Sequence, residues 1–216
     1  NGGPFGWVLY ADEDAIALDA SFIGFDMTDV LDHPVVRTPL MMVLFHRVEQ
    51  LIDGRRIIID IDEFWKALGD DAFRALANDK LKTIRKQNGV MVFGTQSPRD
   101  ALASPIAHTI VEQCPTQIFM PNPRGTRSDY VDGFHLTETE FRLIKEELSA
   151  ESRRFLIKQN GQSVVAELDL GGLDDALAVL SGRTETVELL DRIRAEVGDD
   201  PAAFLPRFHV ERRMSP

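Results

Sequence analysis

The amino-acid sequence predicts an α/β protein with a mostly parallel sheet flanked by helices, an antiparallel edge and a set of C-terminal helices. Three observations lead to this fold class. Strand-like and helix-like patterns alternate through the middle of the chain, as they do where helices connect parallel strands. A hairpin-type turn at Asn160-Gly161 adds antiparallel strands. Residues 173–213 are mostly amphipathic with helical spacing.

The first elements are two short strands and a helix. The strands are expected at residues 6–10 and 22–27, where apolar and aromatic residues cluster. Thr38 is the expected N-cap of the helix, and Pro39 suits its first position. Apolar residues then recur at helical spacing until Gly54, which is expected to end the helix.

Strands and helices are expected to alternate in the centre of the chain. Residues 57–61 are a β-branched run with little alternation, which is typical of a strand buried on both faces. A helix over residues 70–87 separates this strand from a second one at 89–94. A helix over residues 104–113 then precedes a third strand at 116–120.

The last third of the chain begins with a clear helix start. Thr137 and Glu140 have the spacing of a capping box, which predicts a helix over residues 137–148. Strands at residues 154–158 and 163–170 are expected on either side of the hairpin turn.

Composition and charge exclude several classes of protein. The chain has 216 residues, with 24 Lys and Arg against 35 Asp and Glu, and a formal net charge of −11. This acidity argues against avid, sequence-independent binding of nucleic acid, although a local basic groove stays open. The single cysteine, Cys114, cannot form an internal disulfide, and no apolar run approaches the ~20 residues that span a bilayer.

Two acidic residues follow the expected strand at 57–61. Ligands of open α/β sheets bind beyond the carboxyl ends of the strands, and acids placed there favour a cationic partner such as Mg²⁺. An apolar strand followed by Asp62-Glu63 has the Walker B pattern of P-loop ATPases. In that pattern the Asp helps to hold Mg²⁺ and the Glu polarises the attacking water. The alternative is a strand that ends in solvated acids. Phe64 and Trp65, which come next, are expected to pack against the sheet.

Gln96 follows the next expected strand and is a candidate sensor of the γ-phosphate or of the attacking water. The alternative is a plain turn, since Gly94 and Ser97-Pro98 are turn formers.

Arginines can stabilise the charge of a phosphoryl-transfer transition state, and each candidate can equally be a solvated or salt-bridged residue. The candidate arginines are Arg85, Arg124, Arg127, Arg153 and Arg154.

No Gly-x-x-x-x-Gly-Lys-[Ser/Thr] motif occurs in the sequence, so nothing in it is expected to cradle the β- and γ-phosphates. Either the chain is one part of an ATPase, or its Walker B pattern is accidental. The first residue is Asn1 rather than Met, which favours a piece of a longer protein.

Seven short segments of the sequence carry a family resemblance when they are taken together. They are GWV at 6–8, GFDMT at 24–28, IIDIDEFW at 58–65, RKQNG at 85–89, FGTQSP at 93–98, PTQIFMPNP at 115–123 and RFLIK at 154–158. The series resembles the type IV secretion and conjugal-transfer ATPases of the VirB/TrbE/CagE class, and it spans nearly the whole chain in the order of that family. Each segment is weak alone, whereas the series is specific. The family often has a small residue where this chain has Phe64.

The resemblance implies a RecA-like P-loop NTPase fold, of which residues 1–216 would be the C-terminal portion from Walker B onward, with Walker A upstream. It implies ATP and Mg²⁺ as cofactors. Asp62 would be the Mg²⁺-associated acid, acting through water, and Glu63 the catalytic acid. Gln96 would be the sensor, and Arg153 or Arg154 a finger acting on a neighbouring subunit.

The resemblance also implies a hexameric motor at the cytoplasmic face of the bacterial inner membrane, together with secretion-channel subunits and a coupling ATPase. Such a motor would power pilus assembly and the export of DNA or protein, while this fragment alone would be inactive. Two alternatives stay open. One is a non-catalytic docking module that uses the amphipathic residues 173–197, and the other is a translocase that grips DNA directly.

Overall fold

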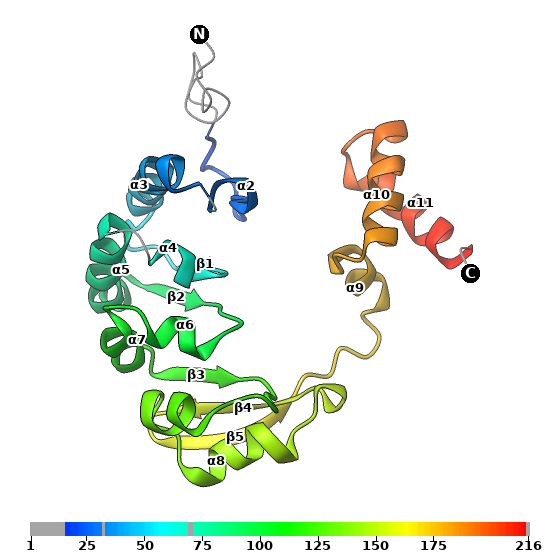
Figure 1. Cartoon of the computed structure of the whole chain (residues 1–216). Coiled ribbons are helices and arrows are strands. Elements are labelled where there is room, and N and C mark those ends of the chain that lie inside the picture. The colour runs from blue at the N-terminus through cyan, green and yellow to red at the C-terminus, as the bar shows by residue number, and fades with distance from the viewer. Residues whose placement is uncertain (1–15, 32, 69–70, 215–216) are drawn as a thin grey trace. The chain divides into compact units, whose positions relative to one another are not determined.

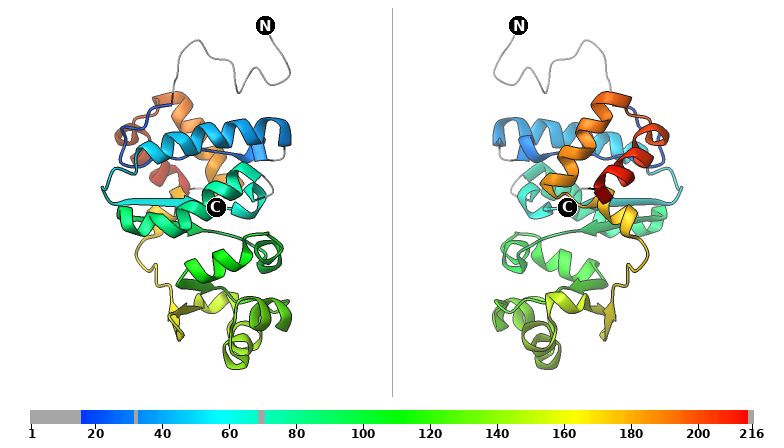
Figure 2. Two further views of the ribbon diagram at one scale, coloured as in Figure 1. Left: turned by 90° about the vertical axis from the view of Figure 1, so that its left-hand side faces the viewer. Right: turned by 90° about the vertical axis from the view of Figure 1, so that its right-hand side faces the viewer.

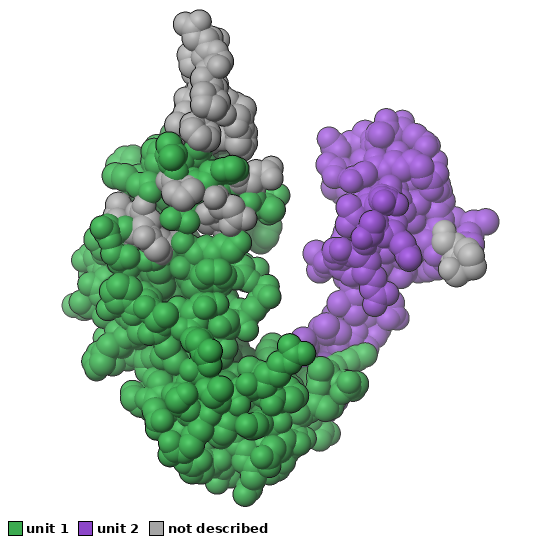
Figure 3. Space-filling model, viewed as in Figure 1, with its two compact units in different colours: residues 1–166 green, residues 167–216 purple. Residues whose placement is uncertain are grey.

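The structure is a computed structural model that describes residues 16–31, 33–68 and 71–214. The chain divides into two compact units, Asn1–Ala166 and Glu167–Pro216 (Figure 3). The predicted α/β class is confirmed, since the first unit holds a parallel strand pair and an antiparallel sheet with helices around them. Among the described residues, no helix has both the length and the apolar character needed to cross a membrane.

The N-terminal part of the first unit differs from the prediction. The expected strand at 6–10 lies outside the described residues, and residues 22–27 form no strand. The reason is local: Asp26 accepts hydrogen bonds from the backbone N–H (2.9 Å) and the hydroxyl (2.7 Å) of Thr28, which turns the chain into the short helix α2, Thr28–Leu31.

The long helix α3 spans Pro34–Gln50, so Thr38 is not its N-cap and Pro39 lies inside it. Pro34 occupies the first turn, where a missing N–H costs nothing. The chain is already helical there, because the N–H of Val36 donates to the carbonyl of His33 (3.0 Å) and Val36 is only 1% exposed.

The parallel pair consists of β1, Ile57–Ile61, and β2, Gly89–Phe93, in a register that pairs Ile57 with Gly89 and Ile61 with Phe93. The helices α3, α5 (Asp71–Thr83) and α7 (Ala107–Gln113) stack in chain order along one side of the unit (Figures 1 and 2). Three elements connect the two strands. The connecting elements are α4 (Phe64–Ala67), α5 (Asp71–Thr83) and the 3₁₀ turn η1 (Ile84–Gln87).

The prediction that residues 57–61 are buried on both faces is wrong for this structure, because their burial alternates. Ile61 and Phe93 pack against a core built by the helices. On the opposite face of the pair, Ile58 is 73% exposed and Val90 is 55% exposed. Helices therefore cover one face of β1 and β2 within the described part of the chain.

The second sheet has the order β3-β4-β5, with β3 at Thr116–Phe119, β4 at Arg154–Gln159 and β5 at Gln162–Glu167. Strand β4 runs antiparallel to β3, and the hairpin to β5 turns at Asn160-Gly161, as predicted. Both turn residues have positive φ, 49° and 80°, which a two-residue hairpin of this type requires. The expected helix at 104–113 is found as α7 (Ala107–Gln113), and a short helix that was not predicted, α6 (Pro98–Leu102), precedes it.

A second core lies beside this sheet and is centred on Ile144 and Leu156, which are 0% and 1% exposed. The predicted capping box is present at the start of α8, Glu138–Arg142, and the expected helix continues as a π-helical turn. The other short elements are η2 (Ser128–Gly133), η3 (Leu143–Glu147) and η4 (Ala150–Ser152).

The second unit is helical, as expected for residues 173–213. Its helices are α9 (Asp174–Leu180), α10 (Thr184–Val197) and α11 (Pro201–Met214). They share a core that includes Ile193 and Phe208, both 0% exposed. The carboxylate of Asp175 on α9 binds the guanidinium groups of Arg212 (2.7 Å) and Arg213 (2.7 Å), which ties the first helix to the last.

The capping glutamate Glu140 is buried and joins three parts of the fold. It accepts hydrogen bonds from the Thr137 backbone (2.6 Å), from the ammonium of Lys158 (3.2 Å) and from the hydroxyl of Ser163. Burial opposes its ionisation, but the bonds from Ser163, Thr137 and Lys158 outweigh that effect and lower the pKa of Glu140.

Ionised Glu140 is therefore expected to stabilise the fold at neutral pH. Its pKa in the folded state lies below the unfolded value of about 4.3, so the stabilisation is complete above that value. It is lost as the pH falls through the lowered pKa of the folded state. Urea unfolding of the native chain and of Glu140→Gln should show a loss of stability at about pH 7 that shrinks near about pH 3. An equal loss at both pH values would contradict this role.

Candidate active site

The acidic pair Asp62-Glu63 lies directly beyond the carboxyl end of β1, and the end of β2 is joined to it. The N–H of Gly94 donates to the carbonyl of Ile61 (3.0 Å), and the N–H of Phe64 donates to the carbonyl of Gly94 (3.4 Å). Gly94 is thus hydrogen-bonded to the residues on both sides of the acids. The parallel register brings the two loops together, as ligand sites of open α/β sheets require.

Asp62 and Gly94 approach so closely that a side chain at position 94 has no room. A Cβ at Gly94 would lie 2.8 Å from Oδ1 of Asp62 and 3.6 Å from its Cα. The same Oδ1 accepts the backbone N–H of Glu63 (2.9 Å), which orients the exposed carboxylate. Within the described residues, Oδ2 of Asp62 has no hydrogen-bond partner and is left for a ligand.

Glu63 has an unusual backbone conformation. Its φ of 49° and ψ of 36° lie in the left-handed region, which residues other than glycine rarely adopt. Its carbonyl accepts the N–H of Lys66 (3.0 Å) at the start of α4, and its Oε2 accepts the indole N–H of Trp65. Such strained positions cluster at functional sites, so the conformation is consistent with a site residue.

The helix that follows the acids is anchored in the core. Phe64 is 2% exposed and packs against Phe93 of β2, with ring centroids 4.9 Å apart. The expectation that Phe64 packs against the sheet is therefore correct. Trp65 is half-buried, and its indole N–H donates to Glu63. The sequence contained no signal for this bond, since residues two apart are not neighbours on a regular helix.

Gln96 lies in the loop between β2 and α6, two residues after Gly94. The hydroxyl of Thr95 donates to the carbonyl of Ser97 (3.1 Å), and the Ser97 hydroxyl oxygen accepts the N–H of Asp100 (3.4 Å) as the N-cap of α6. Ser97-Pro98, predicted as turn formers, instead begin α6, with Ser97 as the N-cap and Pro98 as the first residue of the helix. The Gln96 side chain is exposed at the same edge as the acids, and in the described part of the chain no hydrogen bond joins it to them.

The two candidate fingers, Arg153 and Arg154, also lie at this edge of the first unit. Strand β4 starts where the antiparallel β3 ends, with Leu156 opposite Phe119. Figure 1 shows β1, β2 and β3 pointing the same way, so the start of β4 is at the edge of their carboxyl ends. Both arginines are exposed, and Arg153 has a φ of 53°. Strands β2 and β3 lie between them and β1, so the structure does not bring them together with Asp62 and Glu63.

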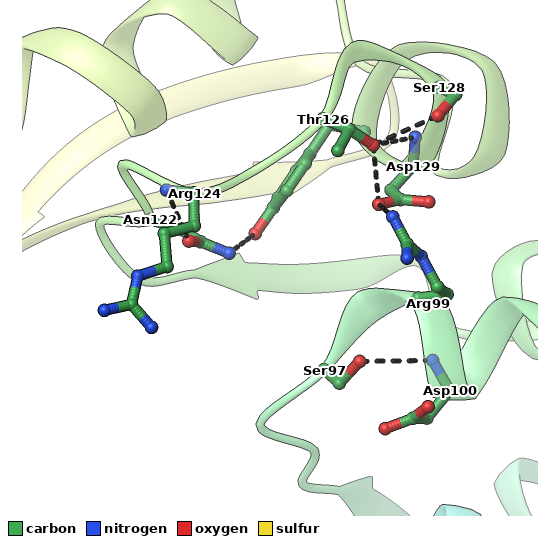
Figure 4. A network of polar contacts seen from close by, with 9 residues as sticks. Ser97, Arg99, Asp100, Asn122, Arg124, Thr126, Ser128 and Asp129 are labelled. Atoms are coloured by element: carbon green, nitrogen blue, oxygen red, sulfur yellow. Dashed lines mark hydrogen bonds and ion pairs between the residues drawn. The ribbon is translucent and has the colours of Figure 1, made fainter.

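A polar network that the sequence did not predict orders the loop after β3 (Figure 4). The amide of Asn122 donates to the hydroxyl of Tyr130 (2.9 Å), and its oxygen accepts the N–H of Arg124 (3.1 Å). A carboxylate oxygen of Asp129 accepts the Thr126 hydroxyl (2.6 Å) and lies 3.6 Å from the guanidinium of Arg99 on α6.

Arg127, another candidate finger, is paired with Glu138 (2.6 Å) and Asp132 (3.0 Å). The hydrogen bond and charge of Glu138, followed by the charge of Asp132, raise the pKa of Arg127. Arg127 is thus engaged in a structural ion pair.

Burial raises the pKa of the Cys114 thiol to about 11, which keeps the thiol protonated at neutral pH and argues against a nucleophilic role.

The donor set of the site suits Mg²⁺ that is shared with a nucleotide. Among the described residues, no three or more His, Cys, Asp or Glu side chains are grouped to hold a metal by themselves. Mg²⁺ in phosphoryl-transfer enzymes usually keeps several waters and binds one or two carboxylates plus substrate phosphates. Asp62 has one oriented carboxylate, whose second oxygen accepts no hydrogen bond from the residues that the structure describes, and it fits that arrangement.

Known proteins share sequence with this chain over most of its length. Residues 1–147 match the family model of the TraG P-loop domain. The chain is 63% identical over 211 residues to a type IV secretion system protein virB4 of Bartonella henselae, covering 98% of this chain and 27% of the relative. It is 49% identical over 212 residues to virB4 of Brucella abortus, covering 98% of this chain and 25% of the relative.

A solved structure shows the same fold. The VirB4 structure of Thermoanaerobacter pseudethanolicus superposes with a TM-score of 0.59 at 19% identity, covering 74% of this chain and 44% of that one. The chain spans about a quarter of the length of the curated relatives it matches (27% and 25%).

Proposed function

Since this chain belongs to the TraG P-loop domain family and resembles the VirB4 class of type IV secretion proteins over nearly its whole length, we propose that it is the Walker B portion of an ATP-hydrolysing secretion motor. On this proposal, residues 1–216 are the C-terminal part of a RecA-like ATPase domain. The Walker A segment lies elsewhere in a polypeptide as long as those relatives, which we call the full-length protein.

The observation that carries the proposal is the acidic pair at the end of β1, where Asp62 packs against Gly94 and Glu63 is bonded to Trp65. Asp62 helps to hold Mg²⁺, through water, and Glu63 accepts a proton from the water that attacks the γ-phosphate. The metal, when bound, supplies charge stabilisation for the phosphate oxygens. Gln96, exposed in the adjoining loop, contacts the water or the γ-phosphate, and Arg153 or Arg154 reaches the site of a neighbouring subunit.

The position of the two arginines supports a multi-subunit arrangement. They lie at the same edge of the first unit as Asp62 and Glu63, with strands β2 and β3 between them and β1. They are therefore better placed to reach the site of a neighbouring subunit than the site of their own chain. We therefore propose a homo-oligomer, a hexamer in the full-length protein, at the cytoplasmic face of the inner membrane. Its partners are secretion-channel subunits and the coupling ATPase, and its work is pilus assembly and transport of DNA or protein substrates.

Steady-state ATP hydrolysis tests this proposal. The full-length protein is expected to turn over ATP with Mg²⁺ and to stop when EDTA removes the metal, because the phosphates need its charge. The 216-residue chain alone is expected to be inactive, since its sequence contains no P-loop motif. Turnover by the short chain, or none by the full-length protein, would contradict the proposal, and the second result would favour a docking module.

A further inference from the structure

The carboxylate of the proposed catalytic residue is held by one neighbouring side chain. The indole N–H of Trp65 donates to Oε2 of Glu63, and within the described residues this is the only hydrogen bond made by that carboxylate. Glu63 is half-buried, and its carboxylate lies at the end of a flexible side chain that can adopt several rotamers. A bond to one oxygen selects one of these rotamers and leaves Oε1 available to a water molecule.

The surroundings of Trp65 hold its indole ring in place, so that it can select one rotamer of Glu63. Its neighbour Phe64 is fully buried and packs on Phe93 of β2, so the first turn of α4 cannot shift without disturbing the core. The ammonium of Lys66 lies 5.9 Å from the centroid of the indole ring, which holds the ring from its face. Glu63 has a left-handed backbone at the start of α4, and its side chain contacts the indole two residues later, a spacing at which side chains of a regular helix do not meet.

We infer that Trp65 is a positioning residue, which orients the Glu63 carboxylate for the attacking water through its indole N–H. This inference rests on the proposed role of Glu63. An indole ring in this place could serve packing alone, and the two roles differ in what they predict. Packing depends on the ring, whereas positioning depends on one N–H group and affects the chemical step rather than the binding of ATP.

The test is Trp65→Phe in the full-length protein, which keeps an aromatic ring and removes the donor. The value of kcat is expected to fall about tenfold to a hundredfold, because small displacements of a catalytic group have effects of that order. KM for ATP and the melting temperature should be nearly unchanged. Lys82→Gln, at an exposed lysine of α5, is the control, and it should leave kcat within about twofold since it touches neither the indole nor the acids.

Two further variants separate positioning from packing. Replacing Trp65 by 3-benzothienylalanine exchanges the N–H for sulfur at nearly constant shape, so it should reproduce the loss of kcat even if Trp65→Phe folds poorly. In a Glu63→Asp background, whose shorter carboxylate cannot keep the bond, Trp65→Phe should cost little more. A native kcat for the benzothienyl variant, or a full additional loss in the Glu63→Asp background, would overturn the inference.

The failure of this inference is distinguishable from failure of the proposed function. Glu63→Gln is measured in the same assay, and a native turnover of that variant would refute the catalytic role of Glu63 whatever Trp65 does. Loss of turnover in Glu63→Gln, together with a native kcat in the benzothienyl variant, would refute only the positioning role.

Discussion

Replacing Glu63 by glutamine is expected to lower ATP turnover of the full-length protein by about a hundredfold or more, because general-base catalysis contributes factors of about 10² to 10⁴. Glutamine has nearly the same shape, and its side-chain oxygen can still accept the indole N–H of Trp65. It cannot take a proton from water. The substitution therefore removes the proposed chemistry and keeps the geometry.

Two measurements check this expectation. Turnover is followed as kcat, and ATP affinity is measured separately with the same preparation. Affinity should stay within about twofold, since Glu63 acts on the water rather than on the nucleotide. Glu188→Gln, at an exposed glutamate of α10, is the control and should leave turnover native. A Glu63→Gln protein that hydrolyses ATP normally would remove the Walker B interpretation.

Gly94→Ala is expected to lower turnover about tenfold while reducing the free energy of unfolding by only about 1 kcal/mol. An added Cβ would lie 2.8 Å from Oδ1 of Asp62, closer than real Cβ contacts come. The side-chain carboxylate is the group that can move. If it moves, it leaves the backbone N–H of Glu63, to which it is bonded at 2.9 Å, and Asp62 loses its orientation.

A large loss of turnover with a small loss of stability would show that Gly94→Ala acts on the position of Asp62 rather than on the fold. Gly182→Ala is the matched control, because no atom lies within 4 Å of its added Cβ and its φ is outside the left-handed range. Turnover and thermal melting are measured for both variants in the full-length protein. Equal turnover of Gly94→Ala and Gly182→Ala would show that Asp62 does not need its present position.

Local patterns in the sequence were sufficient to predict most of the elements. The β-branched run at 57–61, the capping box at Thr137 and the turn at Asn160 each depend on residues within a few positions of one another. The acids at 62–63 were found for the same reason, since a strand and the residues after it are contiguous in the chain.

Predictions that depended on distant partners were less successful. Helix α3 begins at Pro34 rather than near Thr38, and Val36 in its first turn is buried in the tertiary structure. The alternating exposure of β1 is also a tertiary property, because the residues of a strand do not reveal whether helices will cover one face or both.

The sequence by itself determined the fold class and the candidate catalytic acids, because both depend on local spacing. Only the tertiary structure decided how the acids are held: the fit of Asp62 against Gly94, the left-handed backbone of Glu63 and its bond from Trp65. It also separated Arg153 and Arg154 from the acids by two strands. These features depend on strand pairing and on the packing of Phe64 against Phe93, which place residues about thirty positions apart in contact.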